Sequence, residues 1–263
     1  MRTLIITPTL GQSNYLSETI ESIYNIDSPI YHVIICPVKH VSTLQKLYHN
    51  SLVVAEHSET NSMYDAINQA TRHYDDWDYF TYINDDDILF PSFSSHLKNV
   101  RLCNPDISYG MVSMIDTNGR QLYRLPAWKN PNTLNRCWRA GISPFTQQGT
   151  LVSKAAYDIN QGFALKYKLA SDMDFWVRLS CDENTRFFFY NKLVAGYRIT
   201  DGQLSQNRSL MIQEKNKILT NQFTTSKPQR YISSRLILFA MNFKSYSKRF
   251  LFHGLKRSEG FFN

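Results

Sequence analysis

Long apolar runs are absent from this sequence. The longest, residues 236–241, has six residues, whereas a membrane-spanning helix needs about 20, so we expect no transmembrane helix. The first residues do not resemble a secretory signal either, because Pro8 interrupts their apolar run too early. We therefore expect a cytoplasmic protein.

Cysteine is scarce and scattered. The four cysteines stand at positions 36, 103, 137 and 181, with no CxxC pair and no set of cysteines and histidines at the spacing of a zinc finger. This pattern excludes a disulfide framework and a zinc-finger module. Free thiols in a reducing cytosol fit the pattern.

Acidic residues are missing near the end of the chain. Residues 215–258 hold ten Lys and Arg and no Asp or Glu, whereas residues 1–214 hold 19 basic and 21 acidic residues. The net charge of +7 therefore belongs to the tail. A basic tail suggests an anionic partner. We expect no nucleic-acid binding, because no recognition motif is present and the rest of the chain is slightly acidic.

Apolar strands and amphipathic helices alternate through the first 90 residues. Predicted strands cover residues 3–7, 31–36, 52–55 and 78–83, and predicted helices lie around 16–23, 42–49 and 63–70. This alternation predicts an α/β fold with a mainly parallel central sheet and helices on both faces. The second half is less regular: we expect strands at 108–114 and 186–190, a helix at 172–179 and an ordered loop at 126–146.

An acidic triplet, Asp85-Asp86-Asp87, follows the fourth predicted strand. Ligands bind at the carboxyl ends of strands in such sheets. Adjacent carboxylates repel one another unless a cation compensates them, and Mg²⁺ or Mn²⁺ prefers such oxygen ligands. The alternative is a solvated acidic turn that caps the next helix.

Six segments together resemble family-2 glycosyltransferases, which are inverting enzymes of the Rossmann-like GT-A fold with a DXD site. They occur in the family's order between residues 3 and 205. They are 4–9 (LIITPT), 63–68 (MYDAIN), 82–91 (YINDDDILFP), 147–150 (QQGT), 170–179 (ASDMDFWVRL) and 202–205 (GQLS). The resemblance implies metal-dependent transfer of a hexosyl or N-acetylhexosaminyl group from a nucleotide-sugar, with a UDP-sugar favoured. The implied acceptor is a surface polysaccharide or a lipid-linked glycan.

The resemblance also implies roles for individual residues. Asp172 would be the general base, and Asp87 with Asp85 would ligate Mn²⁺ or Mg²⁺. The residues implied on the donor side are Thr7, Pro8, Thr9, Tyr64, Asp65, Asn68, Asp85, Asp86 and Gln148.

Several of these residues also have a purely structural interpretation. Asp172 could be only a helix N-cap, and Arg178 could pair with Asp174 at i,i+4 spacing or contact a phosphate. Asp65 and Asn68 could brace their helix. Gln148 could be a loop amide that satisfies the backbone.

The chain departs from the family pattern at four points. Cys36 stands where an Asp usually reads the base, Gln147 replaces a His, Ser62 replaces a Gly, and no His lies between His96 and His253. Base selection is therefore open. The rival functions are a nucleotidyltransferase, which would need more glycine and a cation around Gly11, and a non-catalytic nucleotide-sugar-binding module.

The tail is predicted to be a separate helical extension, residues 211–263, after a catalytic domain of residues 1–210. Its apolar residues recur at spacings of four and three. They are Ile232, Leu236, Phe239, Phe243, Tyr246 and Phe250. Such a basic amphipathic helix, within residues 227–257, would lie on an anionic membrane or dock its apolar stripe on the catalytic domain.

Overall fold

A computed structural model describes residues 1–56, 62–200, 207–223 and 228–253. The strands are β1 (Thr3–Pro8), β2 (Ile30–Pro37), β3 (Leu52–Glu56), β4 (Tyr79–Tyr82), β5 (Ile88–Leu89), β6 (Ile107–Ile115), β7 (Gln121–Arg124), β8 (Leu151–Ser153) and β9 (Phe187–Arg198). The helices are α1 (Leu16–Tyr24), α2 (Val38–Leu47), α3 (Met63–His73), α4 (Ser92–Cys103), the short 3₁₀ helix η1 (Pro131–Thr133), α5 (Leu134–Arg139), α6 (Lys154–Ile159), α7 (Ser171–Cys181), α8 (Arg208–Gln222), α9 (Pro228–Met241) and α10 (Phe243–His253).

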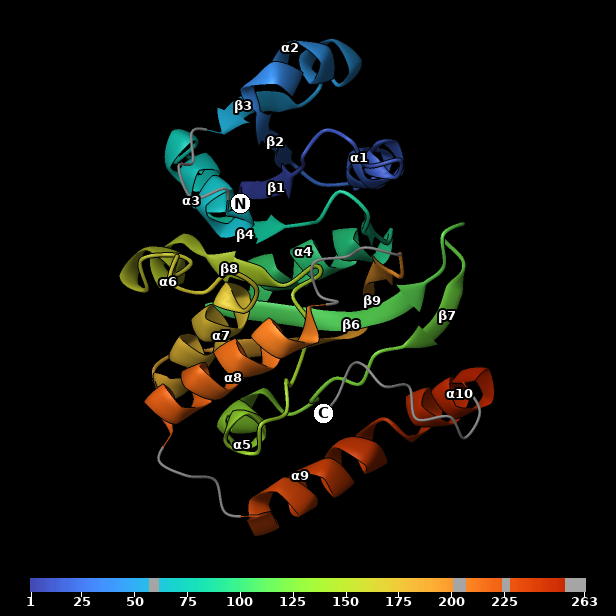
Figure 1. The fold of residues 1–263 in the computed structure, drawn as a ribbon, viewed down its shortest axis with the longest axis vertical. Helices are drawn as coiled ribbons and strands as arrows, with labels where there is room; N and C mark the ends of the chain where they lie inside the picture. Colours follow the sequence, from blue (N-terminus) through green and yellow to red (C-terminus); the bar gives the residue numbers. More distant parts are fainter. Residues whose placement is uncertain (57–61, 201–206, 224–227, 254–263) are drawn as a thin grey trace.

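One nine-stranded sheet organises the molecule (Figure 1). Its order is β3-β2-β1-β4-β8-β6-β9-β5, with β7 paired to β6. The first four strands are mutually parallel, and β6 pairs with β9 in parallel. The short strands β5, β7 and β8 add antiparallel pairs. The predicted α/β class and mainly parallel core are confirmed.

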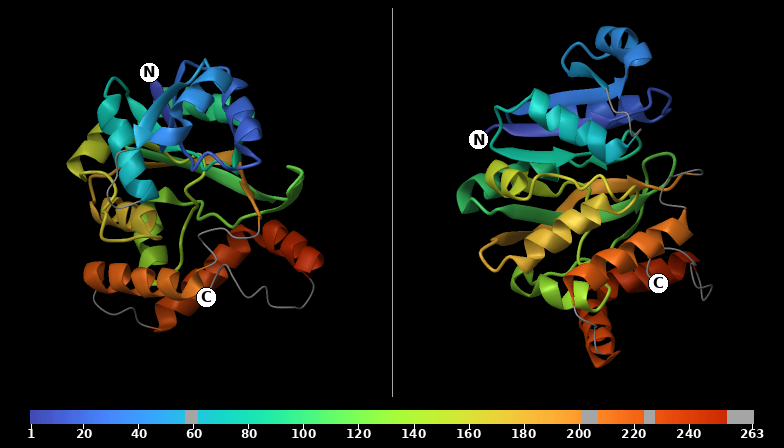
Figure 2. Two further views of the ribbon diagram at one scale, coloured as in Figure 1. Left: turned by 45° about the horizontal axis from the view of Figure 1, so that its top comes forward. Right: turned by 60° about the vertical axis from the view of Figure 1, so that its left-hand side comes forward.

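Helices cover both faces of this sheet. One face packs with α3, α5, α7, α8 and α9 around Phe163 and Phe175, and the other packs with α4 around Phe93 and Leu97. All six of these helices bury apolar side chains in one of the two clusters. Both views of Figure 2 place α9 and α10 on the side of the molecule opposite α2.

Two sequence-based expectations differ from the structure. Residues 126–146 are not only loop, because they include η1 and the helix α5, which buries Cys137 and Trp138. The tail is not one continuous helix, because α9 ends at Met241 and α10 starts at Phe243. The predicted domain boundary at residue 210 stays a prediction; it falls inside α8, whose Ile218 is fully buried in the core.

Candidate functional site

The acidic triplet lies where β1 and β4 end together. The register of these parallel strands places Ile6 opposite Tyr82. Thr9 and Asp85 follow these two residues by three positions each, and the Thr9 hydroxyl donates to Asp85 Oδ2 at 2.5 Å. The turn is held a second time by Ser13, whose hydroxyl donates to the Asp85 carbonyl oxygen at 2.8 Å. Parallel pairing therefore brings the predicted first-strand segment to the acidic turn.

The three carboxylates of the triplet have different surroundings. Asp87 is fully buried, whereas Asp85 and Asp86 are partly exposed. Burial raises the pKa of Asp85, and the negative charge of Asp86 raises it further, while the Thr9 hydrogen bond lowers it. A cation beside Asp85 would relieve this desolvation and repulsion.

Asp87 holds the turn to two distant segments. Its Oδ1 accepts the Arg198 backbone N–H at 2.9 Å, and its Oδ2 accepts from Gln148 Nε2 at 3.0 Å and from Asn84 Nδ2 at 3.2 Å. Burial, and then the charge of Asp86, raise the pKa of Asp87 well above its usual range, against the effect of these three bonds. The carboxylate that the resemblance assigns to the metal is thus enclosed by protein donors, which leaves Asp85 and Asp86 as the accessible acids of the triplet.

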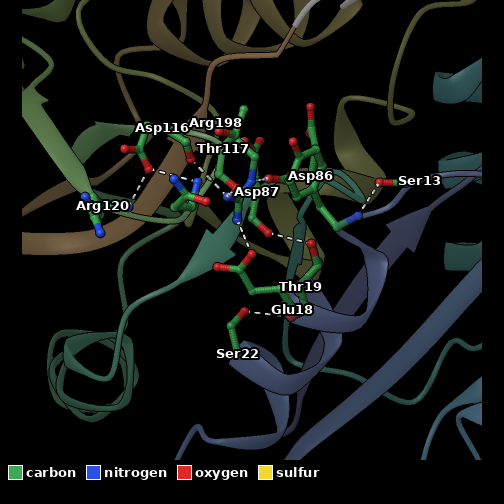
Figure 3. A network of polar contacts seen from close by, with 12 residues as sticks. Ser13, Glu18, Thr19, Ser22, Asp86, Asp87, Asp116, Thr117, Arg120 and Arg198 are labelled. Carbon is green, nitrogen blue, oxygen red and sulfur yellow. Dashed lines mark hydrogen bonds and ion pairs between the residues drawn. The ribbon is translucent and has the colours of Figure 1, made fainter.

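Arg198 is a fully buried cation that fixes the backbone of the same turn (Figure 3). Its Nε donates to the Asp86 carbonyl oxygen at 2.7 Å, and its Nη1 donates to the carbonyl oxygens of Asp116 and Thr117 at 3.0 and 3.1 Å. Its Nη2 pairs with Glu18 at 2.7 Å. The planar, forked guanidinium suits this spread of acceptors. Arg198 was not predicted, because a single Arg at a strand end carries no pattern.

Asp172 lies in the first turn of α7. The N-cap is Ala170, so the N-cap interpretation of Asp172 is wrong. Its Oδ1 accepts the Met173 N–H at 2.7 Å and the Tyr64 hydroxyl at 3.0 Å, and that hydroxyl also donates to the Leu169 carbonyl oxygen at 3.0 Å. Burial raises the pKa of Asp172, while the bonds from Met173 and Tyr64 lower it. A carboxylate that is both oriented and raised in pKa suits proton abstraction.

Glu214 of α8 supports the loop that leads to Asp172. Its two carboxylate oxygens accept the backbone N–H groups of Lys168, Leu169 and Ala170 at 2.8 to 2.9 Å. This buried carboxylate was also missed, because it directly precedes the basic tail and looks like part of it. Glu214 therefore ties the predicted extension to the start of α7.

Asp174 and Arg178 brace α7, as the i,i+4 spacing predicts. Their side chains pair at 2.8 Å, which confirms the structural interpretation. Arg178 also donates to the carbonyl oxygens of Asn160 and Gly162 at 2.6 and 2.9 Å. Its guanidinium is used within the fold and is not placed to meet a phosphate.

Two residues implied on the donor side have internal partners. The Asn68 Nδ2 donates to the Phe163 carbonyl oxygen at 2.8 Å, and its Oδ1 accepts from Tyr157 at 2.6 Å and from the Phe163 N–H at 3.0 Å. Thr7 is buried, and its hydroxyl bonds the His32 ring at 2.9 Å. The structure thus favours the bracing interpretation for Asn68 and directs Thr7 to His32.

The remaining donor-side residues surround the same end of the sheet. Pro8 is buried at the end of β1, and Asp65 is partly exposed in the first turn of α3. The charge of Asp65, after burial, raises the pKa of Glu56 at the end of β3. Glu56 was not predicted. Burial, and then the charge of Glu56, raise the pKa of Cys36 to about 11. The Glu56 carboxylate therefore lies near the position where the resemblance expected an Asp.

The donor set limits how a divalent ion would bind. Within the described part of the chain, no three His, Cys, Asp or Glu side chains are grouped as a ready metal site. Mg²⁺ typically takes one or two carboxylates and completes its shell with water and substrate phosphates. The accessible pair Asp85 and Asp86 fits that arrangement. The matched segment 202–205 lies outside the described residues.

Comparison with known proteins finds relatives by structure alone. No known family profile and no curated protein sequence matches this chain. S. aureus TarS aligns with a TM-score of 0.60 and 17% identity, over 83% of this chain and 42% of TarS. Its 1–349 fragment in complex with UDP-GlcNAc aligns with a TM-score of 0.61 and 15% identity, over 98% of this chain and 77% of the fragment.

A second glycosyltransferase gives the same result. The mannosyltransferase PcManGT of Pyrobaculum calidifontis, in complex with GDP-Man and Mn²⁺, aligns with a TM-score of 0.58 and 15% identity, over 98% of this chain and 76% of that enzyme. The present chain spans less than half of the length of that first TarS chain. At these identities the likeness concerns the fold. This chain has the mixed α/β fold of GT-A-like glycosyltransferases.

Proposed function

We propose that this chain is a metal-dependent, inverting glycosyltransferase of family 2. It would transfer a hexosyl or N-acetylhexosaminyl group from a nucleotide-sugar, with UDP as the favoured nucleotide, to a surface-polysaccharide or lipid-linked acceptor. The observation that carries the proposal is the pairing of an accessible acidic pair, Asp85 and Asp86, with the desolvated carboxylate of Asp172. Tyr82 is electrostatically coupled to both Asp172 and the triplet: burial first, then the charge of Asp172 and, to a smaller extent, the charge of Asp87 raise its pKa well above the usual range.

The structural neighbours support a nucleotide-sugar donor. TarS was solved with UDP and with UDP-GlcNAc, and PcManGT with GDP-Man and Mn²⁺. In this chain Asp85 and Asp86 would hold Mn²⁺ or Mg²⁺ beside the donor diphosphate. A bound divalent ion neutralises the charge that develops on such a leaving group.

The proton chemistry is assigned to Asp172. Its Oδ1 is occupied by Tyr64 and Met173, and no described donor is bonded to Oδ2, so we place the acceptor hydroxyl at Oδ2. The hydroxyl proton moves to the carboxylate while the acceptor oxygen forms a bond to the anomeric carbon. The bond from that carbon to the diphosphate breaks on the opposite side, and its electron pair leaves with the diphosphate. A single displacement of this kind inverts the anomeric centre.

A thermal-shift screen with nucleotide-sugars and Mn²⁺, followed by a donor-hydrolysis assay, tests the proposal. A transferase is stabilised by one sugar nucleotide in the presence of Mn²⁺ and releases its nucleoside diphosphate slowly to water. Stabilisation without hydrolysis would favour a binding module, and release of pyrophosphate from a nucleoside triphosphate would favour a nucleotidyltransferase.

A further inference from the structure

The helix α9 presents an apolar face to solvent. Its inner face is fixed by polar contacts: Arg136 donates to the hydroxyls of Ser233 and Ser234 at 3.0 and 3.3 Å. Asn242, directly after the helix, exchanges two hydrogen bonds with the backbone of Ala127, at 2.9 and 3.2 Å. Leu238 is buried on the same inner side. Of the two alternatives for the apolar stripe, docking on the rest of the chain does not hold for α9, because the opposite face of this helix packs inward.

The outward residues of α9 and α10 form one surface. We call it the tail surface; its apolar members are Ile232, Leu236, Phe239, Phe243, Phe250 and Leu251, which are 45% to 81% exposed. Phe239 contacts Phe243 across the helix junction, with ring centroids 5.6 Å apart, and contacts Tyr246 at 5.2 Å. Exposed apolar residues scattered singly are normal, whereas a contiguous group marks an interaction site.

Cations flank the apolar part of the tail surface. At 100° per residue, Lys244 and Lys248 lie beside Phe243 and Leu251 on the exposed side of α10, and both lysines are exposed. The chain offers no acidic residue between positions 215 and 258 to neutralise them. An apolar face bordered by lysines is typical of helices that lie in the interface of an anionic bilayer, where the lysine stems follow the apolar surface and the ammonium groups meet the headgroups.

We propose that the tail surface binds an anionic lipid surface, with α9 and α10 lying in its plane. No described helix is long and apolar enough to cross a membrane. A second copy of the chain is a poorer occupant, because a two-fold interface brings each patch against itself and would set lysine against lysine without a counter-charge. The inference rests on this surface alone and not on the proposed transfer reaction.

Vesicle co-sedimentation of the full chain, without any nucleotide-sugar, tests the proposal. The probes are vesicles of phosphatidylcholine and vesicles in which about a third of the lipid is phosphatidylglycerol. One variant removes apolar side chains from the tail surface: Leu236→Ser, Phe243→Ser and Leu251→Ser. Its matched control removes side chains that are 63% to 83% exposed on α2, α4 and α6: Leu47→Ser, Leu102→Ser and Ile159→Ser.

A second pair of variants tests the charge. Lys244→Glu with Lys248→Glu alters the tail surface, and Lys46→Glu with Lys192→Glu makes the same change at two exposed lysines on α2 and β9. We expect the wild type and both controls to bind the anionic vesicles and to bind neutral ones at least ~10-fold more weakly. Each lysine near an anionic leaflet raises the affinity roughly five-fold. The tail charge variant should therefore bind anionic vesicles ~25-fold or more weakly than the wild type.

Three outcomes would overturn the proposal. These are the absence of wild-type binding to anionic vesicles, equal losses in the tail and control variants, and a lipid-independent dimer that the apolar tail variant converts to monomer. The last result would assign the tail surface to a second copy. Thermal melts monitor folding, and if the apolar tail variant melts early, the charge variants decide the matter.

Discussion

The hydroxyl of Tyr64 lowers the pKa of Asp172, the proposed base. Its removal should move the acid limb of the pH–rate profile. The Tyr64 hydroxyl donates to Asp172 Oδ1 at 3.0 Å, and this bond stabilises the ionised carboxylate. In Tyr64→Phe the ring and its contact with Phe163, at 5.4 Å between centroids, are retained. The pKa of Asp172 should therefore rise further.

The size of the shift follows from the geometry. A hydrogen bond to a charged group contributes about 1.5–3 kcal/mol, and one pKa unit corresponds to about 1.4 kcal/mol. Because the same hydroxyl is shared with the Leu169 carbonyl oxygen and Met173 still donates to Asp172, we take the lower end, about one unit. A base must be ionised to work, so activity falls at the acidic side first, and the limb moves to higher pH by that amount. Well above the limb, the rate should change by no more than a few-fold.

The assay is the initial rate of nucleoside diphosphate release, measured across the acid limb at saturating donor. Tyr157→Phe is the matched control, because its hydroxyl is also buried and bonds Asn68 at 2.6 Å without touching Asp172. Both variants should lose about 1 kcal/mol of stability, but only Tyr64→Phe should shift the limb. An unshifted limb in Tyr64→Phe, or an equal shift in Tyr157→Phe, would refute the role of Tyr64.

Four further substitutions separate catalytic from structural roles. Asp86→Asn should abolish Mn²⁺-dependent donor binding in calorimetry. Asp87→Asn should keep that binding and lower the free energy of unfolding by about 2 kcal/mol, since its amide opposes one of the three donors; loss of Mn²⁺-dependent binding in Asp87→Asn alone would make Asp87 the ligand. Arg198→Lys should lower the free energy of unfolding by about 3 kcal/mol and lower Tm on the order of 10 °C in a thermal melt. An unchanged Tm would show that Arg198 does not hold the acidic turn in place. Glu214→Gln should lower both kcat and Tm, because an amide offers one acceptor oxygen to three backbone donors; a normal kcat would show that the loop before Asp172 does not need it.

Local pattern was enough to predict much of the fold. The first three strands and α3 follow from apolar runs and helical spacing, which report burial directly. The strands β5, β7 and β8 were not predicted. β5 and β8 have only two and three residues, and the four residues of β7 (QLYR) lack the aromatic run that marks the equally short β4 (YFTY). The helix α5 was read as loop because it has only six residues.

The sequence predicted several of the residues at the candidate site, but it did not predict the role of each one. The difference between Asp86 and Asp87 depends on Gln148 and Arg198, which lie 61 and 111 residues from Asp87 in the chain. The outward face of α9 likewise depends on Arg136 and Asn242, whose polar contacts compete with the apolar stripe for the inner side. Such long-range partners are not visible in a local pattern.

Release of the nucleoside diphosphate from a nucleotide-sugar, by wild type and by Asp172→Asn in the presence of Mn²⁺, tests the central claim most directly. Loss of a general base should slow release by about 10²–10⁴-fold, while calorimetry shows unchanged donor binding. UDP-GlcNAc and GDP-mannose are the first donors to use, because they are bound in the structural neighbours. Near wild-type release by Asp172→Asn, or no Mn²⁺-dependent release by the wild type from any sugar nucleotide, would contradict the account.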